Sequence, residues 1–184
     1  MNLVKKNNPT YHEEKLEEIR YGLESIYLTY TKIFVIFVLA YFLGIIKETL
    51  LLLLTYNIIR TFAFGIHATK SIYCLITSLM LFIGGVYIVK YMSLNIYVKT
   101  IISIMLLICI YKYAPADTYK RPLINERKRK KYKVISTILG IAYVILITIL
   151  NNNIISNYLL IGMLESVIMI HPLIYKIFNL PFDN

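Results

Sequence analysis

The sequence has few cysteines and few acidic residues. Its two cysteines, Cys74 and Cys109, both lie in or beside apolar segments. This excludes the even, loop-borne cysteine framework of a small disulfide-rich secreted domain. A net charge of +10 is compatible with nucleic-acid binding. However, the basic residues flank apolar segments and form no soluble face with aromatic platforms, so we expect no nucleic-acid partner.

Several signals are also missing. The polar opening of the chain has no apolar core followed by a small-residue cleavage site, so we expect no cleavable signal peptide and an N-terminus that stays in the mature protein. The hydrolase signatures G-x-S-x-G and H-E-x-x-H are absent. One His and one Cys without a carboxylate cluster do not meet the ligand count for zinc, so we expect no metal and no other cofactor.

What the sequence does have is apolar residues, which make up 58% of the chain. They gather in six runs, at 33–46, 49–59, 72–89, 94–111, 134–150 and 154–175. Since a spanning helix needs roughly 20 apolar residues, the first two runs are short. The sequence therefore predicts an all-α, polytopic transmembrane bundle of about six helices, with the lipid bilayer as its solvent.

The densest basic block predicts the orientation. Residues 112–133 carry nine of the twenty Lys and Arg residues, and by the positive-inside rule this loop is cytoplasmic. Counting crossings in both directions puts the C-terminus and the start of the 72–89 helix on the cytoplasmic side. The localisation that we expect is a cell membrane, with multiple spans and both termini cytoplasmic.

The chain is expected to form one domain over residues 1–184. Thr10 and Glu13 form a capping-box pattern, and apolar residues then recur at helical spacing, so residues 1–29 predict an amphipathic interfacial helix. It packs on the cytoplasmic ends of the bundle or docks substrate. Residues 30–111 hold four membrane segments, the first two forming a hairpin that turns near residues 44–48 or, alternatively, one tilted helix. The basic loop 112–133 and the last two helices, 134–184, complete the chain.

The chemistry concentrates at His67 and Cys74, within the loop 60–74. Arg60 and Lys70 supply positive charge, and a helix that starts at Ser71 would favour a thiolate at Cys74. On one straight helix the two side chains would be roughly 10 Å apart along the axis, too far for proton transfer. A His67–Cys74 dyad therefore requires a broken or re-entrant chain before Cys74. The competing interpretation is a structural histidine at the interface.

Other polar residues have two interpretations each. Arg60 holds an acidic substrate group or the oxyanion, or it is a topology residue. Lys120 and Arg121 guide an acidic peptide or only set the topology. Glu165, deep in the last apolar run, orients His67, pairs with Arg60, or pairs with a tyrosine or lysine. Cys109, among aliphatic neighbours, is expected to be inert.

Two separated motifs resemble the AgrB-type accessory gene regulator family of membrane cysteine endopeptidases. The first places Arg60, His67 and Cys74 at seven-residue intervals, with G-x-H-A beginning at Gly65. The second is YAPADTYKRPL at 113–123. One departure is Phe64, where many members of that family have a second glycine.

The resemblance implies a thiol protease of quorum sensing in a bacterial cell membrane. In this interpretation His67 activates Cys74, which cleaves a short AgrD-like propeptide through an acyl-enzyme thioester. An internal nucleophile of the peptide then releases a cyclic thiolactone or lactone, the autoinducing peptide. A homodimer is implied by the resemblance alone. The alternative function is a non-enzymatic small transporter or partner subunit, with Glu165, Arg60 and His67 lining a polar path.

Overall fold

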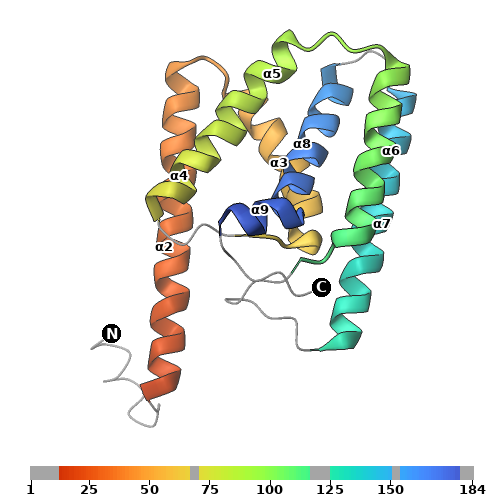
Figure 1. The fold of residues 1–184 in the computed structure, drawn as a ribbon. Helices are drawn as coiled ribbons and strands as arrows, with labels where there is room; N and C mark the ends of the chain where they lie inside the picture. Colours follow the sequence, from red (N-terminus) through yellow and green to blue (C-terminus); the bar gives the residue numbers. More distant parts are fainter. Residues whose placement is uncertain (1–12, 67–70, 117–124, 151–153, 179–184) are drawn as a thin grey trace.

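The computed structural model describes residues 13–66, 71–116, 125–150 and 154–178. Within these ranges the chain is helical apart from short connections and one parallel β-bridge between Phe64 and Ala116. The elements are α2 (Glu13–Phe42), α3 (Ile46–Ala63), α4 (Ser71–Leu79), the π-helix η1 (Met80–Gly84), α5 (Gly85–Tyr91), α6 (Ile96–Tyr113), α7 (Glu126–Ile149), α8 (Ile154–Ile170) and α9 (Pro172–Ile177). The predicted all-α bundle is confirmed (Figure 1).

Three segments of the described chain are long and apolar enough to cross a membrane: Ile72–Tyr91, Ile96–Tyr113 and Glu126–Ile149. Thr29–Phe42 and α8 are apolar but shorter. Large apolar side chains stand on the outside of the bundle, such as Ile101 and Met105 of α6, which are 60% and 61% exposed. An apolar surface of this kind is expected where lipid is the solvent.

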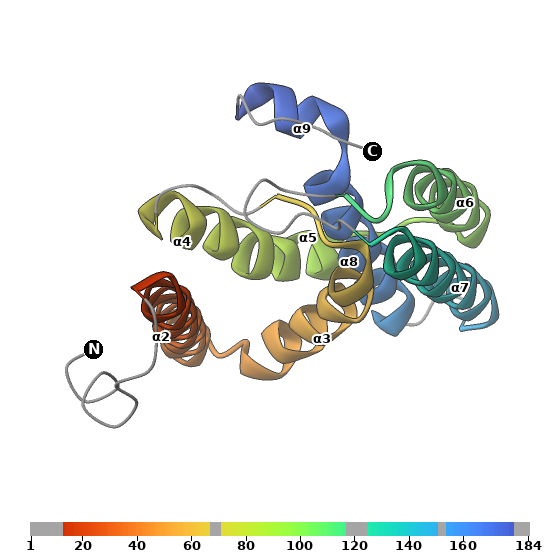
Figure 2. The same ribbon diagram turned by 90° about the horizontal axis from the view of Figure 1, so that it is seen from below.

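Helix α8 forms the centre of the bundle. It packs against α3, α5, α6 and α7, and Figure 2 shows these helices around it. Gly162 permits the closest approach to α3, since a Cβ there would lie 2.5 Å from Thr55 Oγ1. The hydroxyl of Tyr143 on α7 donates a hydrogen bond of 2.7 Å to the Thr55 carbonyl. Small residues and interhelical hydrogen bonds of this kind hold membrane helices together.

The first two apolar runs form the predicted hairpin. Helices α2 and α3 are joined at residues 43–45, where Gly44 has a φ of +67°, a left-handed conformation that glycine adopts without a steric cost. The amphipathic helix expected at residues 1–29 is not a separate element in its described part. It continues into the first apolar run as the 30-residue helix α2, because no proline interrupts residues 13–42.

Two further boundaries differ from the prediction. The last apolar run does not continue as one helix to residue 175, because α8 ends at Ile170 and Pro172 begins α9 in a new direction. The side chain of His171 caps α9 by accepting the Leu173 N–H at 3.3 Å. The basic block is also not all loop: Asn125 caps α7, so residues 127–133 are helical.

Candidate functional site

The chain breaks between α3 and α4, as a His67–Cys74 dyad would require. Helix α3 ends at Ala63, and the next two residues have positive φ angles, 57° at Phe64 and 104° at Gly65. Helix α4 begins at Ser71. No continuous helix therefore joins Arg60 to Cys74. His67 and Lys70 lie outside the described residues.

Residues 64–66 are tied to two distant parts of the chain. The Gly65 N–H donates to the Ala116 carbonyl at 3.0 Å, and the Ala116 N–H donates to the Ala63 carbonyl at 2.9 Å. The Ile66 N–H donates to the carbonyl of Met169, near the end of α8, at 3.0 Å. The two stretches that carry the family resemblance thus meet through backbone hydrogen bonds at Ala116.

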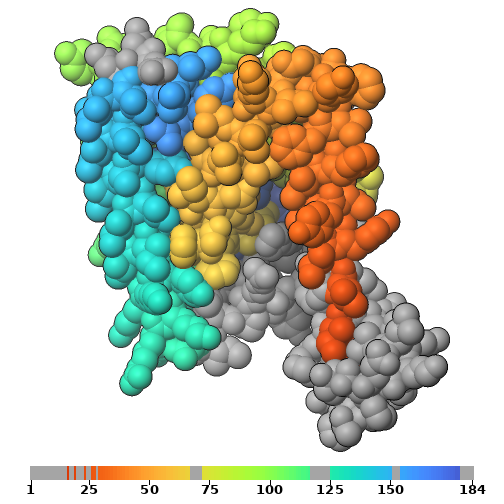
Figure 3. Space-filling view, turned by 180° about the vertical axis from the view of Figure 1, so that it is seen from behind, coloured from red at the N-terminus to blue at the C-terminus, as the bar shows by residue number. Residues whose placement is uncertain are grey.

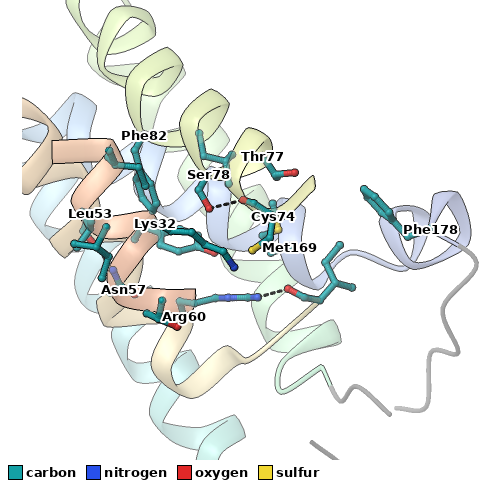
Figure 4. A pocket seen from close by; sticks show the side chains of 16 residues that line it. Lys32, Leu53, Asn57, Arg60, Cys74, Thr77, Ser78, Phe82, Met169 and Phe178 are labelled. Atoms are coloured by element: carbon teal, nitrogen blue, oxygen red, sulfur yellow. Dashed lines mark hydrogen bonds between the residues drawn. The ribbon is translucent and has the colours of Figure 1, made fainter. Parts of the chain in front are cut away.

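Arg60 holds the same segment from the other side. From the last turn of α3, its Nη1 donates to the Phe64 carbonyl and its Nη2 donates to the Ile66 carbonyl. Figure 4 shows the guanidinium reaching from α3 to the segment. Gly65, between these two carbonyls, has no room for a side chain: a Cβ would clash with Arg60 Nη1 and lie 2.5 Å from the Met169 carbonyl oxygen.

Phe64 occupies a left-handed conformation that glycine would adopt more easily. Its ring packs edge-on against Tyr132 of α7, with the centroids 5.1 Å apart. This contact gives a physical reason why the chain tolerates a departure from the glycine of the resemblance: the tertiary packing of the aromatic ring offsets part of the backbone strain.

Cys74 lies in the first turn of α4, half-buried and not in a disulfide. Its side chain lines a cavity of about 260 Å³ between α2, α3 and α4. Seen from behind, α2 and α3 diverge toward one end of the molecule and a hollow opens between them (Figure 3). The polar lining comes from Thr29, Lys32, Asn57, Arg60, Cys74, Thr77 and Ser78.

The cavity is cationic. Lys32 of α2 and Arg60 of α3 both line it (Figure 4), and no carboxylate is among its described lining residues. Lys32 was missed by the sequence analysis, although a single cation at the border of the first apolar run is a usable signal. The hydroxyl of Ser78 donates to the Cys74 carbonyl within the helix, at 2.8 Å.

Of the remaining predicted site residues, the structure describes Glu165, which is not brought to the cavity. Glu165 is buried on α8, with Oε1 against Gly85 of α5. Its Oε2 has no hydrogen-bond partner among the described residues, and it does not line the cavity. Lys120 and Arg121 lie outside the described residues.

Comparison with known proteins assigns the family. The family model of accessory gene regulator B matches residues 1–170. An AgrB-like protein of Clostridium acetobutylicum is 30% identical over 92% of this chain and 81% of its own length. One of Listeria innocua is 30% identical over 99% and 89%. Accessory gene regulator protein B of Staphylococcus aureus is 33% identical over 94% and 90%. No solved structure matches the chain.

The family match agrees with the structure on two points. The long apolar helices and the family together indicate a membrane protein. The match also covers the broken segment after α3, the Cys74 cavity and the Ala116 contact. The chain therefore belongs to the accessory gene regulator B (AgrB) family, which acts in the agr quorum-sensing system.

Proposed function

We propose that this chain is a membrane-embedded cysteine endopeptidase that cleaves a short AgrD-like propeptide and releases a cyclic autoinducing peptide. One observation carries the proposal. Cys74 opens into a cavity that Ile66 also lines, and Ile66 is the residue directly before His67. A thiol, a cavity and the chain that leads to a base are thus adjacent, which is the arrangement that nucleophilic catalysis needs.

In the proposed first step, His67 takes the Cys74 proton and the thiolate attacks a backbone carbonyl carbon of the propeptide. The tetrahedral intermediate collapses, its C–N bond breaks, and the amine of the C-terminal tail leaves with the proton from His67. A thioester between Cys74 and the N-terminal part of the peptide remains. An internal thiol or hydroxyl of the peptide then gives its proton to the neutral His67 and attacks that thioester. The bond between the acyl carbon and the Cys74 sulfur breaks, so that the ring forms and the Cys74 thiolate is released.

The surroundings of Cys74 favour this chemistry. The first turn of a helix presents N–H groups and a positive dipole end to a thiolate. A cavity inside a membrane bundle also limits hydrolysis of the thioester. Exchange of one thioester for another is nearly balanced, whereas forming a thioester from an amide is uphill. Removal of the cleaved tail therefore drives the sequence forward.

The charge of the cavity supports an anionic substrate. Lys32 and Arg60 face it without a carboxylate among the described lining residues, so an acidic group of the propeptide would neutralise positive charge in a poorly solvated place. Lys120 and Arg121 are proposed to guide the same peptide. By the positive-inside rule the basic start of α7 faces the cytoplasm, where the propeptide is made.

Processing in cells tests the proposal. The chain is co-expressed with a candidate propeptide that has a Cys or Ser in its middle and an acidic tail, and cleavage is followed on a gel. We expect Cys74→Ala and His67→Ala to abolish cleavage. Cys109→Ala is the matched control and should retain it, because Cys109 packs in the hydrophobic core. Cleavage by both site variants at the wild-type rate would disprove the peptidase.

The transporter alternative receives less support. It requires Glu165 and Arg60 to line one polar path, but Glu165 lies against Gly85 and outside the Cys74 cavity. The guanidinium of Arg60 is meanwhile bonded to carbonyls of its own chain.

A further inference from the structure

We propose that Arg60 is a positioning residue, whose guanidinium fixes the backbone of residues 64–66 and thereby the point from which the chain enters His67. This inference rests on the proposed function, in which His67 is the base. It changes the role expected for Arg60, since binding an acidic substrate group or the oxyanion becomes secondary.

The guanidinium spans a single residue. Its two terminal nitrogens donate to the carbonyls of Phe64 and Ile66, one on each side of Gly65. The Ile66 carbonyl is the last one before His67 in the sequence, so this hydrogen bond restrains the last described residue before the histidine. The planar fork of arginine is suited to two acceptors at once, whereas the lysine ammonium is a single point donor.

The N–H groups of the same segment are held by the rest of the fold. Phe64 N–H donates to the Arg60 carbonyl at 3.1 Å, Gly65 N–H to Ala116, and Ile66 N–H to Met169. Ala116 is itself anchored, because its carbonyl also accepts the hydroxyl of the buried Tyr175 at 3.4 Å. Residues 64–66 are therefore held through N–H groups by α3, α8 and the Ala116 segment, and through carbonyls by Arg60.

The two cations that line the cavity differ in their hydrogen-bond partners, which predicts different roles for them. Arg60 uses both terminal nitrogens inside its own chain. Lys32, on α2, lines the same cavity and has no hydrogen bond or ion pair with another described residue, so its ammonium is available to a ligand. Substitution of Arg60 should therefore reduce the rate of the chemical step, and substitution of Lys32 should weaken substrate binding.

The experiment compares Arg60→Gln with Lys32→Gln, which removes the same charge from the same cavity without contacting residues 64–66. Both are made in a Cys109→Ala background, so that Cys74 is the only thiol. Propeptide cleavage gives kcat and KM, and the rate of Cys74 alkylation by iodoacetamide against pH reports the thiol without any substrate. His67→Gln and the Arg60→Gln/His67→Gln double variant complete the set.

We expect Arg60→Gln to lower kcat by about 100-fold, the size of effect that a misplacement of about 1 Å produces, with little change in KM. It should slow alkylation near neutral pH as His67→Gln does, and the double variant should be no slower. Lys32→Gln should raise KM and leave the alkylation profile unchanged. Arg60→Lys keeps the charge but not the planar fork, so its kcat and its alkylation rate are expected to lie between those of wild type and Arg60→Gln. It replaces Arg60→Gln if that variant does not fold.

Three results would overturn the inference. An Arg60 variant that raises KM with kcat preserved would make Arg60 a substrate anchor. Additive effects of Arg60→Gln and His67→Gln on alkylation would make the two residues independent. If His67→Gln slows alkylation and both Arg60 variants are alkylated at the wild-type rate, the dyad hypothesis stands and the positioning role of Arg60 is rejected. By contrast, normal cleavage and alkylation in His67→Gln would reject the proposed function itself.

Discussion

Gly65 offers the sharpest test of the contacts that hold residues 64–66. In Gly65→Ala the new Cβ would clash with Arg60 Nη1 and lie 2.5 Å from the Met169 carbonyl oxygen. The arginine end can swing away, but the Met169 carbonyl is backbone at the end of α8 and accepts the Ile66 N–H. Relief of the clash therefore requires the segment itself to move.

The cost follows from three contributions. An L-residue at a φ of 104° carries backbone strain of about 1–3 kcal/mol. Losing the Ile66 to Met169 hydrogen bond costs about 0.5–1.5 kcal/mol, and losing a charge-assisted bond from Arg60 costs about 1.5–3 kcal/mol. Together these amount to roughly 3–7.5 kcal/mol, concentrated on three residues. The segment is expected to detach while the helices stay folded.

The assay is the initial rate of propeptide cleavage in membranes that contain equal amounts of each variant. We expect Gly65→Ala to lower kcat by about 100-fold. Gly44→Ala is the matched control, because Gly44 also has a positive φ, of 67°, yet a Cβ there meets nothing within 4 Å. Activity of Gly65→Ala within about twofold of wild type, or an equal loss in Gly44→Ala, would refute the reasoning from contacts.

Further predictions concern packing and charge. Gly85→Ala should lower the thermal unfolding midpoint in detergent, since its Cβ would lie 2.5 Å from the buried Glu165 Oε1 of α8. A Cβ at the neighbouring Gly84 meets open space, so Gly84→Ala should leave the midpoint unchanged or raise it. Equal midpoints of the two variants would contradict this. Phe64→Gly and Tyr132→Ala both remove the ring contact, but only Phe64→Gly also relieves the backbone strain at residue 64. The thermal unfolding midpoint of Phe64→Gly is therefore expected to be higher than that of Tyr132→Ala. Lys32→Gln should raise the KM for an acidic propeptide several-fold, while Lys32→Arg should keep the wild-type KM. Cleavage at varied substrate concentration measures both. A fall in kcat with an unchanged KM would count against substrate binding by Lys32.

The parts of the site that could be predicted were those that depend on neighbours along the chain. The 3.6-residue period, the 1.5 Å rise and the length of apolar runs are local properties. They sufficed to predict the helical bundle, the hairpin turn at Gly44, the start of a helix just before Cys74 and the break in the chain after Arg60. The role of His67 stays a prediction, because it lies outside the described residues.

Local reasoning missed what depends on how helices meet. The boundary at residue 29 was wrong because helix propensity continues across it, and only the three-dimensional path shows α2 as one helix. The pairing of Glu165 with Arg60 was an open alternative, and packing instead put Glu165 against Gly85.

The sequence by itself determined which segments are helical and apolar, and where the chain must break for a cysteine and a histidine to meet. Only the tertiary structure decided what holds that break: Arg60 on its carbonyls, and Ala116 and Met169 on its N–H groups. The physical reason is separation along the chain. Residues 116 and 169 contact residues 65 and 66 through backbone atoms, which every amino acid has, so no side-chain pattern in the sequence records those contacts.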